Sequence, residues 1–460
     1  MDSPIKSYSV FSKIRKTVLE KIQPSKKELL IETAFAQNLV SILLPHLPLG
    51  VVPNITGSVA KRTFISGNNE VDLFLLFPKS TSKSDFEQIL ISLLNKALPG
   101  VGYQLSYAEH PYLRFHYKNH RIDLVPAYAI EDASELLSAV DRSILHTKFI
   151  RRNLSSSQIP DVLLLKQFLK SNGLYGAEIK IQGFSGYLCE LLIVHFGSFW
   201  KMATFFASLK SDLVIDIKKY YDKSQYSLLG SRFGFFVMID PTDKNRNVSA
   251  AVSRENFNLL SKLCKKLILK PSTSMFLDAP ASFEDLVSAN ASPVGVMITM
   301  PRPNIVSDVL WGQIRKLMGQ LEVHLKDYEV NSIFSDDSRH LVRIFVGSKK
   351  LENGGKVLLR GPPSKMKTHV EKFRKSHVGS KFSIRDGFIY VSKTIPVLSI
   401  SDSIHAFFDS YAKTSKSHLA FSSDLIVADL IKGKDSNSSK KSKEKNTKVK
   451  KLKKGSTSKK

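Results

Sequence analysis

Residues 57–61 read Gly-Ser-Val-Ala-Lys, and residues 70–77 read Glu-Val-Asp-Leu-Phe-Leu-Leu-Phe. The second segment is apolar after its first three positions, which predicts a buried β-strand. Side chains alternate between the two faces of a strand, so Glu70 and Asp72 share a face, about 6.6 Å apart. Two ionised carboxylates at this spacing repel each other by roughly 2–3 kcal/mol at an effective dielectric constant of 20. Hard cations placed beside the pair would reverse that repulsion.

The Gly-Ser segment ends a few residues before this strand. A turn that leads into a helix presents backbone N–H groups to a phosphate, and Gly57 would let the backbone approach closely. The Ser58 hydroxyl would donate to a phosphate oxygen. Glu-x-Asp pairs are also common on solvated strand faces, so the pair taken alone favours the plainer interpretation.

A third carboxylate, Asp123, lies within the apolar run Ile122-Asp123-Leu124-Val125. A lone Asp in a buried strand needs a partner, because burying an unpaired charge is costly. One interpretation is a structural ion pair, for instance with Arg121 or Arg142. The other is a two-metal site, in which Glu70, Asp72 and Asp123 hold two Mg²⁺ ions and Asp123 activates an attacking hydroxyl.

The charge of the chain indicates a polyanionic partner. The 460 residues carry a formal net charge of +27. Lys432–Lys460 contains 13 Lys and two acidic residues, so this segment accounts for +11 and residues 1–431 for +16. Lys and Arg placed on phosphates release condensed counterions, which favours nucleic acid as the partner. A membrane surface is the rival polyanion.

Cysteine usage and hydropathy argue against an exported or membrane protein. The two cysteines, Cys189 and Cys264, have no CxxC or Cys/His spacing, which is typical of reduced thiols in a cytoplasmic protein. No apolar run reaches the roughly 18 residues that a membrane span needs, since Pro45, Pro48 and Glu190 interrupt the longest candidates.

Periodicity predicts an α+β chain. A capping box of Ser25 and Glu28 opens a helix that Pro45 ends. Asp161 caps a helix over 161–172 that Gly173 stops. Further helices are expected over 184–208, 253–269, 315–328 and 366–374, and strands over 71–77, 121–125, 294–298, 341–346 and 388–391. After Gly433 the sequence has too few apolar residues to fold, so a disordered tail is expected.

Several segments together resemble one family. The Gly-Ser turn, the acid-x-Asp strand and a distal Asp form the pattern of the polymerase-β-like nucleotidyltransferase superfamily. The narrower resemblance is to the archaeal, class I CCA-adding enzymes and covers roughly residues 30–270. It rests on residues 107–112, 138–143 with His146, 164–166, 172–178, 183–192, 240–241 and 246–248.

The resemblance implies a role for each matching residue. Glu70, Asp72 and Asp123 would bind the catalytic Mg²⁺ ions. Ser58 and Lys61 would hold the incoming nucleotide near its triphosphate, and His146, Lys166 and Tyr175 would complete the nucleotide pocket. Arg246 would help to read the base edge. Outside the family match, Tyr175 would simply pack at a helix end and Lys166 would extend its ammonium from a helix face to solvent.

The implied organisation is a nucleotidyltransferase head over 1–144, a mostly helical central domain over 145–270, an α+β RNA-binding region over 271–430 and a disordered Lys-rich tail over 431–460. The implied activity is template-independent addition of CCA to the 3′ end of tRNA from CTP and ATP. A homodimer and a cytoplasmic location are expected by the same resemblance.

The chain departs from the family pattern in two places. Lys61 stands where most members have Arg, which replaces a bidentate fork with a point charge. Ile179 stands where a Tyr is often found, so a stacking or hydroxyl contact from that position is in question. The Lys-rich tail is either a solubilising segment or a non-specific RNA tether.

Two other functions fit the same scaffold. A poly(A) polymerase would share the chemistry but would not use CTP. A non-catalytic RNA-binding protein would have no need for Glu70, Asp72 and Asp123, and their presence argues against it.

Overall fold

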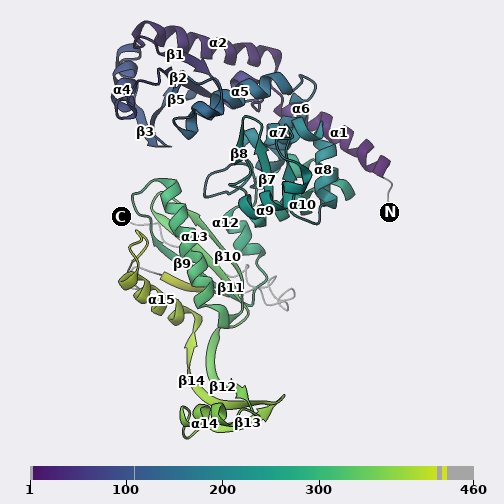
Figure 1. The fold of residues 1–460 in the computed structure, drawn as a ribbon, viewed down its shortest axis with the longest axis vertical. Coiled ribbons are helices and arrows are strands. Elements are labelled where there is room, and N and C mark those ends of the chain that lie inside the picture. The colour runs from purple at the N-terminus through teal and green to yellow at the C-terminus, as the bar shows by residue number, and fades with distance from the viewer. Residues whose placement is uncertain (1–3, 108, 422–426, 433–460) are drawn as a thin grey trace, which may run out of the picture. The chain divides into compact units, whose positions relative to one another are not determined.

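A computed structural model of the protein describes residues 4–107, 109–421 and 427–432, and its α+β composition agrees with the fold class expected from the sequence (Figure 1). The chain divides into two compact units, Met1–Pro280 and Ala281–Lys460. The expected disordered tail lies outside the described residues, apart from Ile431 and Lys432. The finer division at residues 144 and 270 stays a prediction.

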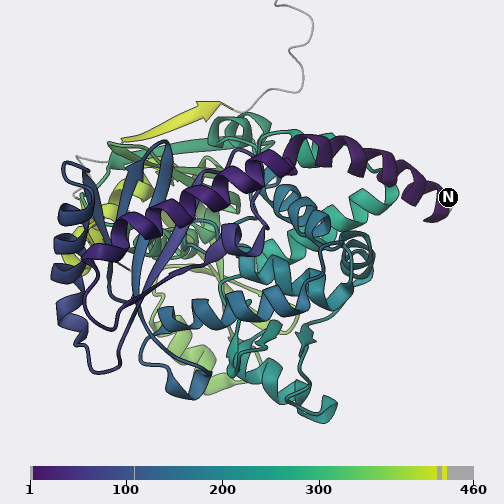
Figure 2. The same ribbon diagram turned by 90° about the horizontal axis from the view of Figure 1, so that it is seen from above.

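The first unit contains a five-stranded sheet in the order β1-β2-β5-β4-β3. Strands β2 and β5 are parallel, and the other neighbours are antiparallel. Helices α2 and α4 share a hydrophobic core with the sheet, and Figure 2 shows α2 running across it. The short helix α3 connects β1 to β2. The bounds are β1 Val52–Ile55, β2 Glu70–Phe77, β3 Tyr103–Tyr107, β4 Pro111–Tyr117, β5 His120–Tyr128, α2 Lys26–Leu43, α3 Gly57–Lys61 and α4 Phe86–Ala97.

The start of α2 differs from the expected capping box. Ser25 is the N-cap, and its hydroxyl accepts a hydrogen bond from the Glu28 backbone N–H at 3.1 Å. The Glu28 carboxylate, however, accepts from the Ser66 hydroxyl and the Gly67 N–H, both at 2.8 Å. The predicted capping box is therefore wrong in one part. The Glu28 side chain does not turn back to the N-cap but binds the loop before β2.

By length and composition, the helical stretch Lys26–His46 is apolar enough to cross a membrane, contrary to the sequence expectation. The pair α7 and α8 would qualify only as one element bent by 91°. In the structure, α2 packs on the sheet. Glu32 Oε2 of α2 lies 3.1 Å from His120 Nε2 of β5. The Phe35 ring stacks on the His120 ring, with the two centroids 3.6 Å apart.

The helical part of the first unit has its own core, to which the N-terminal helix α1 also contributes. A small sheet, β6-β7-β8, packs beside these helices. The bounds are α1 Pro4–Ile22, α5 Arg142–Asn153, α6 Ile159–Ser171, α7 Gly186–Phe196, α8 Phe199–Ser208, α9 Tyr226–Phe233, α10 Arg254–Leu269, α11 Ser274–Leu277, β6 Leu213–Ile215, β7 Phe236–Asp240 and β8 Asp243–Asn247.

Two expectations in this helical part are corrected. The helix expected over 184–208 is two helices, because Gly197 adopts φ +82° and ends α7. Asp161 does not cap α6, whose N-cap is Gln158. Asp161 lies in the first turn instead and accepts a hydrogen bond from the Phe199 N–H at 3.3 Å.

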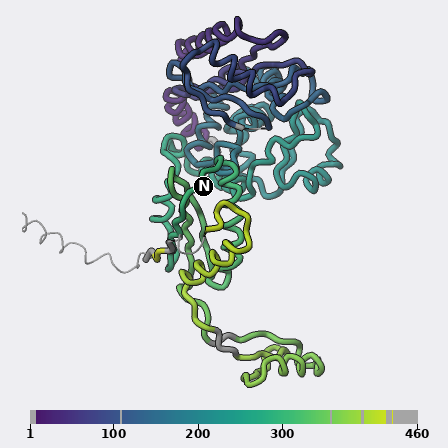
Figure 3. Tube along the Cα trace, turned by 90° about the vertical axis from the view of Figure 1, so that its left-hand side faces the viewer, coloured from purple at the N-terminus to yellow at the C-terminus, as the bar shows by residue number. Residues whose placement is uncertain are grey.

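The second unit is built on an antiparallel sheet in the order β10-β11-β9-β15. Helices α13 and α15 share its core. Strands β12 and β14 pair along their length and lead to β13 and α14, which lie at the far end of this unit (Figure 3). The bounds are α12 Phe283–Ala289, β9 Val294–Pro301, α13 Ser307–His324, β10 Val330–Asp337, β11 Leu341–Ser348, β12 Glu352–Pro363, α14 Lys367–Lys375, β13 Lys381–Arg385, β14 Phe388–Ser399, α15 Ile400–Thr414 and β15 Val427–Lys432.

The strands expected over 294–298, 341–346 and 388–391 are confirmed as parts of β9, β11 and β14. The helix expected over 315–328 begins earlier, at Ser307, and ends at His324. Short 3₁₀ turns occupy Leu44–His46, Lys83–Asp85, Ala133–Glu135, Ala139–Asp141, Lys223–Gln225 and Lys326–Tyr328.

Candidate active site

The parallel pairing of β2 and β5 brings two of the predicted acids together. Asp72 and Asp123 are register partners across the two strands. Burial raises the pKa of Asp72 to about 6, and the nearby charges of Asp123 and Glu70 add to this rise against the opposing charge of Lys61. The two carboxylates therefore form a strained pair in the absence of a cation.

Arg114 holds Asp123 through a bidentate ion pair. The two residues face each other across the antiparallel pair β4 and β5. Arg114 Nε and Nη2 donate to Asp123 Oδ1 and Oδ2, both at 2.7 Å. This contact raises the pKa of Arg114 further. The ion-pair partner of Asp123 is thus neither Arg121 nor Arg142, the two residues considered from the sequence.

Glu70 lies two positions before Asp72 and pairs with Arg121, the ion-pair distance being 2.8 Å. Since arginines engage Glu70 and Asp123, no group of three or more His, Cys, Asp or Glu is already gathered as a metal site within the described residues. The donor chemistry nevertheless fits a divalent cation. Carboxylate oxygens are its preferred ligands, and a cation would counter the burial and the repulsion that together raise the Asp72 pKa.

Gly57 allows the start of α3 to lie directly against Asp72. Its φ is +65°, in the left-handed region, and a Cβ on Gly57 would overlap the Asp72 carboxylate. The N–H of Thr56 donates to the Asp72 carbonyl oxygen at 2.9 Å and fixes this approach. Ser58 follows at the first turn, and its hydroxyl makes no hydrogen bond within the described part of the chain, so it is available to a ligand.

Two of the predicted nucleotide-binding lysines meet at one buried carboxylate, Glu190 of α7. Lys61 Nζ lies 2.7 Å from Glu190 Oε2, and Lys166 Nζ lies 3.3 Å from Oε1. The Thr63 hydroxyl donates to Glu190 at 2.6 Å, and Lys166 also donates to the Thr63 carbonyl oxygen at 2.9 Å. Burial alone would raise the Glu190 pKa, but the two lysines outweigh burial and lower it. We call Lys61, Thr63, Lys166 and Glu190 the Glu190 cluster.

Tyr175 lies near enough to both Glu190 and the acids of β2 to interact with their charges. A Cβ on Gly186 would lie 3.0 Å from the Tyr175 hydroxyl and 3.7 Å from Lys166 Nζ, so both groups lie against the start of α7. Burial raises the pKa of Tyr175, and the acidic groups around it, Glu70 and Asp72 among them, add to the effect. Lys170 Nζ lies 5.3 Å from the Tyr175 ring centroid.

Asp240, at the end of β7, gathers His146 and Arg246. Its Oδ2 accepts from His146 Nε2 and from Arg246 Nη1, both at 2.8 Å, and its Oδ1 accepts from the Tyr187 hydroxyl at 3.2 Å. The His146 ring stacks on Tyr187 with centroids 3.8 Å apart. Burial lowers the pKa of His146, so we assign a neutral ring that donates from Nε2.

Sequence reasoning missed three residues that organise this site: Glu190, Arg114 and Asp240. Each had a sequence feature that pointed to it. Glu190 is a lone acid within the apolar helix Leu188–Ile193, and Asp240 ends the apolar strand Phe236–Asp240. Arg114 alternates with Leu113 and Phe115 in β4, which places it across from an acid on the neighbouring strand.

Comparison with known proteins decides the family. Residues 160–277 match the family model described as tRNA nucleotidyltransferase, second domain. A CCA-adding enzyme of Methanosarcina acetivorans is 32% identical over 85% of this chain and 87% of its own length. Those of Methanosarcina barkeri and Methanocaldococcus jannaschii are 34% and 32% identical, over 78% and 81% of this chain and 80% and 85% of their own lengths.

The chain belongs to the CCA-adding enzymes.

The structure of this CCA-adding enzyme shows what surrounds the two residues that depart from the family pattern, Lys61 and Ile179. Lys61 places a single ammonium on Glu190, a contact that needs no bidentate fork. Ile179 is 37% exposed, on the segment between Tyr175 and the start of α7.

The contact between Gly57 and Asp72 predicts the effect of one methyl group. In Gly57→Ala the new Cβ displaces the Asp72 carboxylate, and we expect activity to fall about 100-fold, since a shift of about 1 Å at a reacting group has that cost. Gly67→Ala is the matched control, because Gly67 also has a positive φ of +79° but has open space where its Cβ would lie. Equal activities of the two variants would contradict the close approach.

The buried contacts of Asp240 predict a pH-dependent loss of stability. Burial would raise the Asp240 pKa, but the bonds from His146 and Arg246 outweigh it and lower the pKa below its ordinary value of 3.8. The stabilisation is therefore fully present above about pH 4 and is lost as the pH falls below that. At pH 7, Asp240→Asn should lower the free energy of unfolding by about 3 kcal/mol.

Denaturant unfolding measures this difference, which should shrink below about pH 4. In the control Asp212→Asn, the lost ion pair with Arg254 is exposed, so the change should stay within about 0.5 kcal/mol. If the two variants lose stability equally, the Asp240 network does not contribute as described.

Proposed function

We propose that this chain builds and repairs the 3′-terminal CCA of tRNA, adding two C residues from CTP and one A residue from ATP. The observation that carries the chemistry is the placement of Asp72 beside Asp123 on parallel strands, with Gly57 and α3 against them. The tRNA 3′-hydroxyl attacks the α-phosphorus of the nucleotide, and pyrophosphate leaves. No nucleic-acid template takes part.

Asp72, Asp123 and Glu70 would hold Mg²⁺. Bound there, the ions would supply charge neutralisation to the attacking and leaving oxygens of the phosphoryl transfer. Asp123 accepts two hydrogen bonds from Arg114, which fix the orientation of its carboxylate. Burial raises the pKa of Asp72, so its ionised form would be stabilised by a bound cation.

The nucleotide would lie beside the N-terminal end of α3, next to the Glu190 cluster. Within the described residues the Ser58 hydroxyl has no hydrogen-bond partner, and Lys61, on the same short helix, carries an ammonium group that is held by Glu190. Lys166 and Tyr175 meet at Gly186 and would close the other side. Glu190 then acts as a positioning residue, because it holds both lysines without contacting the substrate.

His146 and Arg246 would face the base and ribose end of the nucleotide. Arg246 remains 35% exposed in its side chain although it pairs with Asp240, so its guanidinium retains donors for a ligand. His146 donates to the same Asp240 oxygen as Arg246, so both side chains are held beside one carboxylate. Asp240 would thus orient the Arg246 guanidinium as a hydrogen-bond donor for the base edge. It would also hold the His146 ring in place for packing against the nucleotide.

The tRNA would be held mainly through phosphates, in keeping with the +16 charge of residues 1–431. The second unit would carry part of this contact, as the expected C-terminal RNA-binding region. A homodimer and a cytoplasmic location belong to the proposal as well, the latter in keeping with the free, buried thiols of Cys189 and Cys264.

The test is incorporation of labelled CTP and ATP into tRNA that lacks its CCA end, with Mg²⁺, by the wild type beside Asp72→Asn and Asp123→Asn. The wild type should add two C and one A and stop, and each variant should lose at least about 1,000-fold in rate, because a metal ligand is gone. Asp132→Asn, an exposed loop carboxylate, is the control and should keep full activity.

The other outcomes separate the remaining functions. Addition of A alone, or addition without a stop, would indicate a poly(A)-type enzyme and remove the CCA assignment. Binding of tRNA without any incorporation would indicate a non-catalytic scaffold.

A further inference from the structure

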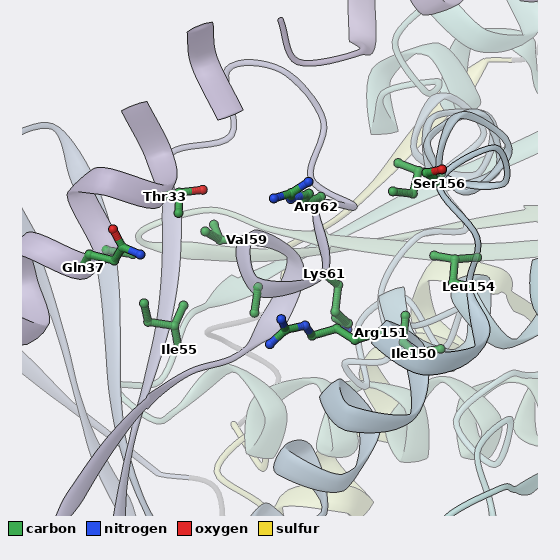
Figure 4. A pocket seen from close by; sticks show the side chains of 13 residues that line it. Thr33, Gln37, Ile55, Val59, Lys61, Arg62, Ile150, Arg151, Leu154 and Ser156 are labelled. Carbon is green, nitrogen blue, oxygen red and sulfur yellow. The ribbon is translucent and has the colours of Figure 1, made fainter. Parts of the chain in front are cut away.

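Two adjacent pockets lie on the first unit at the end of α3, away from the residues assigned above apart from Lys61. The first has a volume of about 410 Å³ and is lined from α2, α3 and the end of α5, with Lys61, Arg62 and Arg151 around it (Figure 4). The second, of about 430 Å³, is lined by Lys148, Arg151 and Arg152. The pockets share Ile55 and Arg151, so they form one continuous surface.

This surface is cationic without compensation. No Asp or Glu lines either pocket. Arg62, Lys148, Arg151 and Arg152 are exposed, and none of them forms an ion pair within the part of the chain that the structure describes. We call these four residues the α5 basic surface. Lys148, Arg151 and Arg152 follow the i, i+3, i+4 spacing, so they share one face of α5.

Arg62 occupies a backbone position that Gly would fill with less strain. It ends α3 in the left-handed conformation with φ +57° and ψ +32°. A residue with a Cβ pays roughly 1 kcal/mol there relative to Gly. The sequence has Arg at this position, and its side chain lines the first pocket together with Lys61 and Arg151 (Figure 4).

The lining indicates which anion fits. No aromatic residue lines either pocket, so no platform exists on which a base would stack. Among the uncharged polar residues there, Gln37, Asn54 and Ser156 can donate hydrogen bonds to a ligand, whereas the hydroxyls of Thr33 and Thr147 already donate to the Leu29 and Ser143 carbonyl oxygens. Cations spread over two adjoining pockets, among aliphatic side chains such as Ile55 and Val59, suit several phosphates in a row better than one nucleoside triphosphate.

We propose that the α5 basic surface binds backbone phosphates of the RNA substrate, apart from the nucleotide and the reacting 3′ end. This inference rests on the proposed function, in which RNA is the substrate. The surface starts at the C-terminal end of α3, whose N-terminal end lies against Asp72, about 7.5 Å of helix away. The Lys-rich segment after Gly433 has the same sign of charge, so it does not compete for the surface.

The test is the salt dependence of binding to tRNA that lacks its CCA end, for the wild type and the triple variant Arg62→Gly, Arg151→Gln and Arg152→Gln. The logarithm of the tRNA association constant falls with the logarithm of the salt concentration, and each lost phosphate contact should make this slope less steep by about one. In the triple variant the slope should therefore be less steep by about 2–3. The KM for tRNA should rise at least about tenfold, with kcat and the KM for CTP unchanged. Gly suits the φ of Arg62, and a melting curve checks that the variant is folded.

The matched control removes the same charge elsewhere on the first unit, through Lys96→Gln, Lys262→Gln and Lys265→Gln, three exposed lysines that line neither pocket. Its slope should stay within about one unit of the wild type. An unchanged slope in the triple variant, or an equal fall in the control, overturns the proposal. A rise in the KM for CTP alone would reassign the surface to the nucleotide and also overturn it.

Failure of the proposed function gives a different result. The wild type would then not add two C and one A and stop, whatever the binding slopes of the variants.

Discussion

The buried carboxylate of Glu190 is the interaction on which the site depends. It is inaccessible to solvent, and it lies on α7 of the helical core, while Lys61 and Thr63 flank the end of α3 beside the sheet. A buried charge with no partner costs several kcal/mol, so separating Glu190 from Lys61 and Thr63 would destabilise the packing of the two parts of the first unit. Lys166 of α6 adds a second cation to the same oxygen pair.

This contact positions groups that are far apart in the sequence. Lys61 ends the helix whose first residue, Gly57, lies against Asp72, so a shift at Glu190 would be passed along five residues to the acids proposed to hold the metal ions. On the other side, Lys166 and Tyr175 both lie against Gly186 at the start of α7. The positions of the β2 acids and of the groups expected to hold the nucleotide therefore both depend on the contacts of Glu190.

The sequence predicted the local part of this arrangement and not the long-range part. Alternation placed Glu70 and Asp72 on one face of a buried strand, and the lone Asp123 indicated a second acidic strand, because both patterns lie within a few residues. The register that makes Asp72 and Asp123 neighbours comes from parallel pairing across about fifty residues, which no local pattern specifies. For the same reason the partner of Asp123 was missed: Arg114 faces it only once β4 folds back on β5.

The helix ends show the same limit on a smaller scale. Ser25 was recognised as a cap from its position, but Glu28 found partners in Ser66 and Gly67, which only the fold brings near. The single turn at Gly197 divides a run that periodicity alone reads as one helix. Glu190 looked like an interruption of an apolar helix, and the structure makes it the centre of the site.

A double-mutant cycle on Lys61 and Glu190 tests this account most directly. The free energies of unfolding of Lys61→Met, Glu190→Gln and the double variant would be compared with that of the wild type. If the buried contact joins the two parts, the double variant should lose less than the sum of the single losses, by about 1–3 kcal/mol. Losses that add within about 0.5 kcal/mol would show that Lys61 and Glu190 act independently, and would contradict the account.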